Sequence, residues 1–141
     1  MSLYVIARIQ DEEYALDIEK VQTIEKMMPI TRVPQTESHV KGVINLRGEI
    51  IPIISLRKKL GLEEKEYDED TRIVVLKAYD MLVGVIVDNA NEVVDIPEEN
   101  IDKLTFSDAS DDFSKYVSKV GKIKDKVLLI LDLKKLLDVR M

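Results

Sequence analysis

Apolar and polar side chains alternate over short stretches along the whole chain, and turn residues separate the stretches. Such alternation is typical of strands that bury one face. We count about five strands in each half and no long amphipathic helix, which predicts a mainly β fold of two small SH3-like five-stranded β-barrels with short helices. Ser55 and Asp132 are expected to cap two of these helices. The predicted strands are Leu3 to Ile9, Tyr14 to Ile18, Val21 to Glu25, Val43 to Leu46, Ile50 to Ile54, Ile73 to Ala78, Leu82 to Val87, Glu92 to Ile96, Val120 to Ile123 and Val127 to Leu131.

Two parts of the chain repeat earlier parts. Ile123 to Leu137 aligns with Leu46 to Leu60 at a constant offset of 77 residues. Ile73 to Tyr79 aligns with Leu3 to Ile9 at an offset of 70. The agreement lies in the pattern of apolar positions more than in residue identity, and it predicts one module that is used twice.

The repeat predicts how the chain is divided. We expect residues 1–141 to form a single domain, with the first barrel over about residues 10–66 and the second over about residues 69–141. The N-terminal strand 3–9 is expected to pair with the second barrel. Residues 63–70 (EEKEYDED) are dense in charge but lack the ligand pattern of a calcium loop, so they are expected to be a solvated linker.

Arg47 and Gly48 lie between two predicted strands. Glycine readily adopts the positive φ that a two-residue hairpin turn needs. Arg47 is then either a charged anchor for a partner or the partner of a nearby acid such as Glu49. Pro52, in the next strand, has no N–H to donate, which predicts an edge strand or a local irregularity.

Composition narrows the classes of function. The net charge of −6 and the aromatic content of 5% argue against a nucleic-acid surface, which needs cationic side chains and stacking platforms. The absence of cysteine excludes disulfides and thiolate chemistry. No apolar run has the length of a membrane span and no basic-then-apolar leader is present, so a cytoplasmic protein without membrane insertion is expected.

Catalytic motifs are missing from the sequence. It contains no phosphate-binding loop, no paired-histidine zinc motif and no nucleophile elbow. The one histidine, His39, cannot build a multi-histidine metal site, and as a general base it would have only the adjacent Ser38 as nucleophile. We therefore expect a non-enzyme without cofactor or metal, whose function lies in binding.

The segment from Gly42 to Gly48 (GVINLRG), continued by Ile50 to Ile54 (IIPII) and Leu56-Arg57, resembles the signature of the CheW family, the coupling proteins of bacterial chemotaxis. Further segments of the chain agree with the family pattern, so that the resemblance covers nearly all of it. The clear departure is Ser55, where the family usually has aspartate. Both residues can cap a helix, so only the local charge is expected to change. The agreeing segments are Glu13 to Ile18 with Val21-Gln22, Val83 to Asp88, and Leu129 to Asp132.

The resemblance implies an adaptor without chemistry of its own. In this family one barrel docks on the regulatory domain of the histidine kinase CheA, and a groove between the barrels receives the cytoplasmic tip of a chemoreceptor. Such a protein would be cytoplasmic and associated with membrane receptor arrays through its partners. It would pass a change in the receptor to the kinase through shared contacts.

Carried over by position, two sets of residues are implied as binding sites. On the strand from Val21 to Glu25, alternation puts only one parity inside, and both parities are open. Phe106 lies in an irregular segment and is either a plug over a barrel or an anchor for the kinase. The kinase set is Val21, Thr23, Ile24, Gly42, Arg47 and Phe106. The receptor set is Asn45, Leu46, Gly48, Arg72, Ile73, Gly84, Val85 and Val87.

Two other functions compete with the adaptor. A tandem β-barrel module for a small ligand would need an internal cavity, whereas the runs of Ile, Val and Leu favour filled barrels. A larger coupling protein with a fused receiver domain would resemble this chain over one domain, but no second α/β pattern is present.

Overall fold

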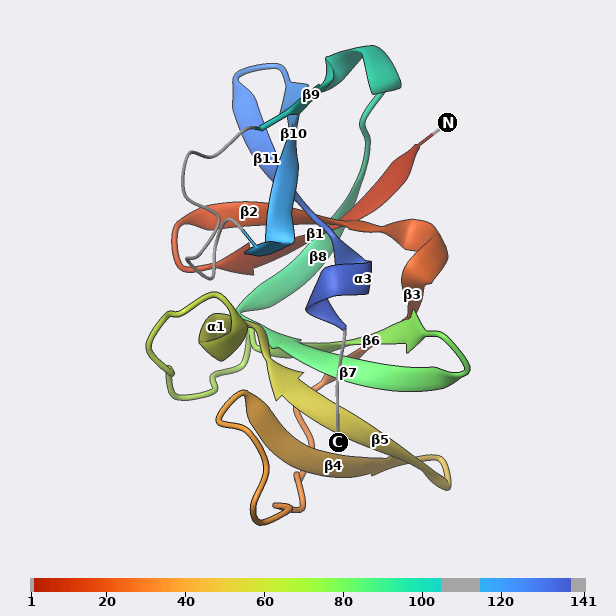
Figure 1. Cartoon of the computed structure of the whole chain (residues 1–141), viewed down its shortest axis with the longest axis vertical. Coiled ribbons are helices and arrows are strands. Elements are labelled where there is room, and N and C mark those ends of the chain that lie inside the picture. Colours follow the sequence, from red (N-terminus) through yellow and green to blue (C-terminus); the bar gives the residue numbers. More distant parts are fainter. Residues whose placement is uncertain (1, 105–114, 138–141) are drawn as a thin grey trace.

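The computed structural model describes residues 2–104 and 115–137. The fold is mainly β, as predicted, with a few short helices (Figure 1). Each strand follows one of the predicted apolar stretches, and one short strand near residue 102 was not predicted. The elements are β1 (Leu3–Ile9), β2 (Glu12–Asp17), η1 (Ile18–Lys20), β3 (Val21–Lys26), β4 (Val40–Leu46), β5 (Glu49–Ser55), α1 (Leu56–Lys59), β6 (Arg72–Ala78), β7 (Met81–Val87), β8 (Asn89–Asp95), η2 (Glu98–Asn100), β9 (Ile101–Lys103), β10 (Val117–Ile123), β11 (Lys126–Leu131) and α3 (Leu133–Leu136).

The strands form two sheets that lie one above the other in Figure 1. One has six strands in the order β8-β1-β2-β11-β10-β9, and the other has five in the order β3-β6-β7-β5-β4. Among the described strands neither sheet closes on itself, so the barrel description is not confirmed. In the five-stranded sheet one bridge crosses the gap: Thr31, beyond the end of β3, exchanges backbone hydrogen bonds of 2.8 and 2.9 Å with Val43 on β4.

Each sheet takes strands from both halves of the sequence. The hairpin β1–β2 lies between β8 and β11, and the hairpin β6–β7 lies between β3 and β5. The registers agree: the parallel pair Ala15 and Ile130 corresponds to the parallel pair Gly84 and Ile53. The predicted division into residues 10–66 and 69–141 is therefore not the division between the sheets. The two copies exchange their first hairpins, and a hairpin has the same apolar pattern in either sheet.

The first hairpins align at an offset of 69, not 70. Gln10 and Tyr79 are the equivalent first turn residues, with φ angles of 54° and 57°, and 79 minus 10 gives the offset. The predicted offset was wrong by one residue, which would turn every side chain of the strand to the opposite face. The second hairpins keep the predicted offset of 77, because their turns begin at Arg47 and Lys124, with φ of 53° and 54°.

Three groups of buried apolar side chains hold the fold together. The largest lies between the two sheets and takes residues from both, together with Leu56 on α1 and Leu133 on α3. Each sheet has a second core on its other face. β6 shows the consequence, because Val74 faces the central core while Ile73 and Val75 face the second one. A strand buried on both faces reads as a continuous apolar run.

The sequence predicted two helix caps and an unusual strand position for a proline, and the structure tests all three. Ser55 Oγ accepts a hydrogen bond from the backbone N of Lys58 at 3.2 Å, which confirms the predicted helix cap. Asp132 caps α3 in the same way. Of the two alternatives predicted for Pro52, the edge strand is wrong, because β5 lies between β4 and β7. The proline fits because the pairing with β7 begins only at Ile53.

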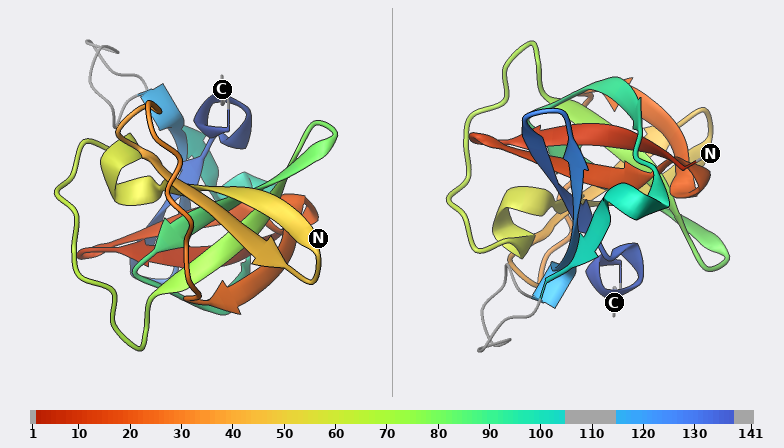
Figure 2. Two further views of the ribbon diagram at one scale, coloured as in Figure 1. Left: turned by 90° about the horizontal axis from the view of Figure 1, so that it is seen from below. Right: turned by 90° about the horizontal axis from the view of Figure 1, so that it is seen from above.

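Residues 62–70 connect α1 to β6 as a long loop along the outside of the molecule, drawn in yellow-green in Figure 2. Its residues are mostly exposed, as expected of a linker. The segment nevertheless binds the folded body: the side chain of Glu64 accepts hydrogen bonds of 2.6 Å from Ser55 Oγ and 2.8 Å from Lys41 Nζ, and the carbonyl of Glu63 accepts one of 3.0 Å from Arg57. The segment is therefore fixed to the domain at defined points.

Candidate partner-binding surface

The turn between β4 and β5 has a tightly defined backbone. Arg47 and Gly48 both have positive φ, 53° and 88°, as in the two-residue turns that match the twist of a hairpin. The side chain of Asn45 fixes the turn, since its Oδ1 accepts a hydrogen bond of 2.9 Å from the backbone N of Gly48. No heavy atom lies within 4 Å of a Cβ built on Gly48, so the backbone angle and not the space requires glycine here.

Arg47 reaches from this turn to β3. Its side chain is 73% exposed, and its guanidinium lies 3.7 Å from Glu25 Oε2. Thr23 Oγ1 donates a hydrogen bond of 2.7 Å to the same carboxylate. One of the two alternatives paired Arg47 with a nearby acid such as Glu49; in the structure the acid beside it is Glu25, so the ion pair joins the turn to β3. The structure thus brings Thr23 and Arg47, both members of the predicted kinase set, to one place.

Glu25 was missed from the sequence although a signal was present. It shares the parity of Val21 and Thr23 on β3, and all three are half-buried. A carboxylate on a half-buried face needs a cationic or hydrogen-bonding partner. Ile24 has the opposite parity and is 38% exposed, which answers the question that alternation left open.

Ile50 is a second residue that was not predicted. It is the second residue of β5, pairs with Asn45 across the hairpin, and is 62% exposed. We refer to Ile24, Glu25, Asn45, Arg47 and Ile50 together as the turn surface. It combines two exposed isoleucines with a guanidinium that lies 3.7 Å from a carboxylate, and its residues belong to β3, β4, β5 and the turn between β4 and β5.

Gly42, a member of the predicted kinase set, has a structural reason for being glycine. It is buried and has a φ of 140°, and a Cβ added there would collide with the backbone carbonyl of Thr31. The bridge between Thr31 and Val43 passes directly over it. Gly42 therefore allows the chain after β3 to reach the edge of β4.

The predicted receptor set is divided between the surface and the core. Ile73, Val85 and Val87 are 0%, 1% and 0% exposed, so they offer no surface to a partner and belong to the core. Gly84 is also buried, and a Cβ there would collide with Ile53. These residues were implied as receptor contacts by the family resemblance, with several of them expected to be core as well, and in the structure both faces of β6 and β7 are covered.

The remaining receptor residues lie near the turn or at the start of β6. Asn45 and Gly48 are exposed, and Leu46 is half-buried against the core of the five-stranded sheet. Arg72 is half-buried and donates hydrogen bonds of 2.7 and 2.9 Å to the carbonyls of Glu69 and Thr71. Phe106, from the kinase set, lies outside the described residues.

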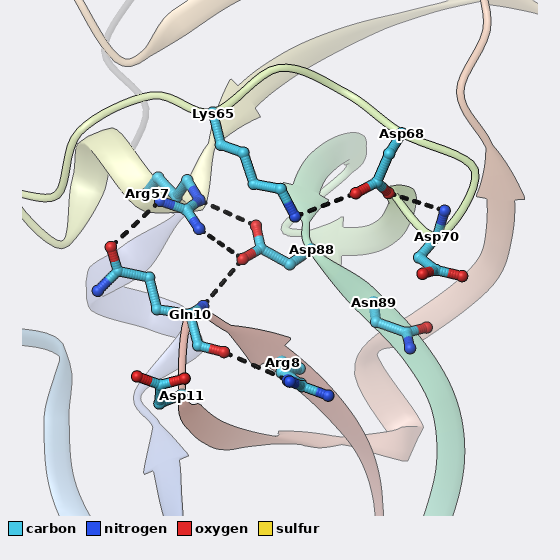
Figure 3. Close-up of a pocket in the computed structure, with 9 residues that line it drawn as sticks. All are labelled: Arg8, Gln10, Asp11, Arg57, Lys65, Asp68, Asp70, Asp88 and Asn89. Atoms are coloured by element: carbon cyan, nitrogen blue, oxygen red, sulfur yellow. Dashed lines mark hydrogen bonds and ion pairs between the residues drawn. The ribbon is translucent and has the colours of Figure 1, made fainter.

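A polar cavity of about 550 Å³ lies between the tip of hairpin β1–β2 and the segment 65–70 (Figure 3). Its main charges are already paired. Arg57 donates hydrogen bonds of 2.9 and 2.6 Å to the two carboxylate oxygens of Asp88, and Lys65 lies 3.1 Å from Asp68. A bidentate arginine pair of this kind is a strong joint between elements. The Arg57–Asp88 pair therefore joins α1 to the end of β7.

Asp88 is the centre of this joint. It is mostly buried, which raises its pKa, but the hydrogen bonds from Arg57 and from the backbone N of Gln10 outweigh burial and hold the pKa below its usual range. The carboxylate is thus charged at neutral pH. Its bond to Gln10 also fixes the tip of hairpin β1–β2 against the sheet that contains β7.

No group of three or more His, Cys, Asp or Glu side chains within residues 2–104 and 115–137 is placed to hold a metal ion. In the same part of the chain, no helix has the length and apolar character needed to cross a bilayer.

Comparison with known proteins gives the family. A family model described as the CheW-like domain matches residues 3–141. The chain belongs to the CheW family. CheW proteins similar to it include the chemotaxis protein CheW of Bacillus subtilis, 37% identical over 95% of this chain and 85% of the relative, and that of Klebsiella aerogenes, 36% identical over 95% and 80%.

A solved CheW structure has the same fold. The crystal structure of the scaffolding protein TtCheW from Thermoanaerobacter tengcongensis superposes with a TM-score of 0.88, at 33% sequence identity over 99% of this chain and 94% of that one. The resemblance seen in the sequence around GVINLRG is thus confirmed at the level of the family, and the chain belongs to a family of chemotaxis scaffold proteins.

Proposed function

We propose that this chain is a non-enzymatic chemotaxis adaptor that joins the regulatory domain of the histidine kinase CheA to the cytoplasmic tip of a chemoreceptor. Membership of the CheW family supports the proposal, as does the similarity to a protein described as a scaffold. In this function the chain works in the cytoplasm and reaches the membrane arrays through its partners. Each sheet, with its own core, would act as one small barrel.

The observation that carries the proposal is the exposed guanidinium of Arg47 in the turn surface. It is 73% exposed and lies 3.7 Å from Glu25, so it is accessible to a partner. Ile50, on the strand after the turn, and Ile24, on β3, are 62% and 38% exposed and offer apolar area on the neighbouring strands. Arginine beside apolar side chains is the usual composition of an interface centre. We assign Ile24, Glu25, Arg47 and Ile50 of this surface, with Thr23, to the kinase.

The receptor is assigned to the other side of the same turn. Asn45, Leu46, Gly48 and Arg72 remain from the receptor set after the core residues are removed. In this assignment Ile24, on β3, contacts the kinase and not the receptor. The chain then has no reaction to perform, and its output is the geometry in which the two partners are held together.

Paired substitutions at the two equivalent turns test the kinase surface. Arg47→Ala is expected to weaken binding of the CheA regulatory domain by about 1–3 kcal/mol, the range for loss of a charged anchor. Lys124→Ala removes a cation from the equivalent turn of the other copy and serves as the matched control. Calorimetry that finds equal affinity for both variants and the unchanged chain would show that the kinase binds elsewhere.

Amide shifts test whether the adaptor holds both partners at once. A receptor-tip fragment and the kinase domain are each added alone and then together. Separate sets of shifted residues and binding without displacement are expected. If each partner displaces the other, the chain is an alternating binder and the coupling mechanism is wrong.

A further inference from the structure

The two copies contain the same site in two different states. In the first copy the site lies beside the start of α1 and includes Ser55, Arg57 and Ile86. Residues 64–67 fill it and leave a cavity of only about 10 Å³. We call these four residues the strap. The offsets of 77 and 69 turn the three site residues into their equivalents in the second copy, which are Asp132, Lys134 and Asp17.

The strap is held mainly through one carboxylate. Glu64 accepts hydrogen bonds of 2.6 Å from Ser55 Oγ and 2.8 Å from Lys41 Nζ. Partial burial raises the pKa of Glu64, but these two bonds outweigh it and the pKa is lowered. Arg57 adds a bond of 3.0 Å from its guanidinium to the carbonyl of Glu63. An extended acidic segment thus binds this site within the chain itself.

The equivalent site in the second copy is an open pocket of about 280 Å³. Among the described residues, no segment fills it as the strap fills the first site. We call it the lysine pocket, because it has three lysines around its walls. Its lining consists of Tyr4, Asp17, Lys20, Lys119, Ile130, Leu131, Asp132, Leu133 and Lys134.

The charges of the lysine pocket favour an anion. Within the described part of the chain, Lys20, Lys119 and Lys134 form no ion pair, although all three are exposed. Both acidic side chains in the lining accept backbone hydrogen bonds, Asp17 from Glu19 at 3.0 Å and Asp132 from Lys135 at 3.3 Å. The pocket therefore carries an excess of one positive charge on a protein whose net charge is −6.

We propose that the lysine pocket binds an extended acidic segment of a partner protein, in the way that the first copy binds its strap. The strap shows that the geometry accepts an extended chain with a carboxylate at its centre. Asp132 occupies the position equivalent to Ser55, the residue that binds Glu64 in the first copy. The incoming carboxylate is therefore received by Lys119 and Lys134 and not by Asp132. This site is separate from the turn surface, and its test does not depend on the kinase or the receptor.

The strap sequence itself supplies the probe. A labelled peptide with the sequence of residues 61–70 (GLEEKEYDED) is added to the full chain, and binding is followed by fluorescence anisotropy and amide shifts. The strap in place occupies the first site at a high effective concentration, so the free peptide is expected in the lysine pocket. Shifts at Lys119, Lys134 and Tyr4, and weaker binding in high salt, would support the proposal.

Charge-reversal variants distinguish binding in the lysine pocket from general electrostatic attraction between the acidic peptide and the chain. The double variant Lys119→Glu and Lys134→Glu is expected to lower the affinity for the peptide about tenfold or more, with an unchanged circular dichroism spectrum. The control, Lys103→Glu with Lys124→Glu, makes the same change in net charge at exposed lysines outside the pocket. Equal losses in both variants would overturn the proposal, as would amide shifts confined to Ser55 and Lys41, which would show strap displacement.

Discussion

The turns at Arg47 and Lys124 have the same place in the fold and nearly the same φ, 53° and 54°, yet their surroundings differ. Arg47 faces a carboxylate, Glu25, at 3.7 Å. The residue equivalent to Glu25 in the other copy is Val94, so Lys124 has no such partner there. The apolar pattern and the strand register give both copies the same backbone course at this turn. The exposed side chains around the turn nevertheless differ between the copies. Function must be argued from the local chemistry of each copy and not from the shared fold.

Buried positions of the two copies differ as well. Gly42 is covered by the bridge to Thr31, whereas its equivalent, Lys119, is exposed and lines the lysine pocket. Asp88 is paired with Arg57 and mostly buried, whereas its equivalent, Glu19, is exposed. Equivalent positions therefore contribute differently to the stability of the two copies. Matched substitutions at such positions can measure the difference in unfolding free energy.

The largest difference is expected between Gly42→Ala and Lys119→Ala. The added methyl group at Gly42 meets a backbone carbonyl at a φ of 140°, so strain and overpacking together are expected to cost about 3–5 kcal/mol of unfolding free energy. Lys119→Ala removes an exposed side chain and is expected to stay within about 0.5 kcal/mol. Urea denaturation of both variants measures this. Similar small costs would mean that the bridge at Thr31 does not constrain Gly42.

The second comparison concerns Asp88→Asn and Glu19→Gln. Loss of one partner from the Asp88–Arg57 pair leaves a mostly buried guanidinium without its anion and is expected to cost about 2–4 kcal/mol. Glu19→Gln is expected to stay within about 0.5 kcal/mol.

The same pair predicts a dependence on pH. Because the pKa of Asp88 is lowered in the folded chain, its stabilisation is present above the ordinary carboxyl pKa of about 4 and is lost as the pH falls through the folded value. Unfolding curves between pH 7 and pH 3 should show a smaller loss for Asp88→Asn than for the unchanged chain. Parallel losses in both proteins would contradict the assigned role of Asp88.

A smaller effect is expected from Gly48→Val. A valine at a φ of 88° is strained, which is expected to cost about 1–3 kcal/mol, although no neighbouring atom obstructs the side chain. Asp125→Val in the equivalent turn is the control, since Asp125 is not among the residues with positive φ. A thermal melt in which Gly48→Val is unchanged would show that the turn relaxes to another geometry.

The smallest effect is expected from Arg47→Ala on stability. The ion pair with Glu25 spans 3.7 Å and Arg47 is 73% exposed, so its loss is expected to change the unfolding free energy by about 0.5 kcal/mol or less. Lys124→Ala should behave alike. If thermal melts instead show a large loss for Arg47→Ala alone, the guanidinium supports the fold and the assignment of the turn surface to a partner is weakened.

The positions of the strands were predictable because each stretch has a clear period and turn residues at its ends. The exchange of the first hairpins between the two copies was not predictable from the sequence. Alternation states which face of a strand is buried, but β1–β2 and β6–β7 have similar patterns and would fit either sheet. The one-residue error in their offset has a similar cause, since runs such as Ile73 to Leu76 are apolar at both parities.

The candidate site was predictable in part. Gly48 was identifiable because a two-residue hairpin turn makes a specific demand on the backbone. Glu25 could be suspected from its parity on β3, but its partner could not be named, because Arg47 comes from a turn more distant in the sequence. Ile73, Val85 and Val87 were placed at a surface because sequence position alone does not reveal that a second core covers the other face of their sheet.

The exchanged hairpins also affect how the chain can fold. β2 must find β11, as Tyr14 pairs with Leu129, so the sheet that contains the earliest strand is completed by one of the last. Contacts this distant in sequence slow folding, because a long loop must close before the contact contributes. During synthesis β1 and β2 would wait with their outer edges unpaired until β8 and β11 leave the ribosome. In that interval the hairpin β1–β2 is open to pairing with other chains, which exposes the nascent chain to aggregation.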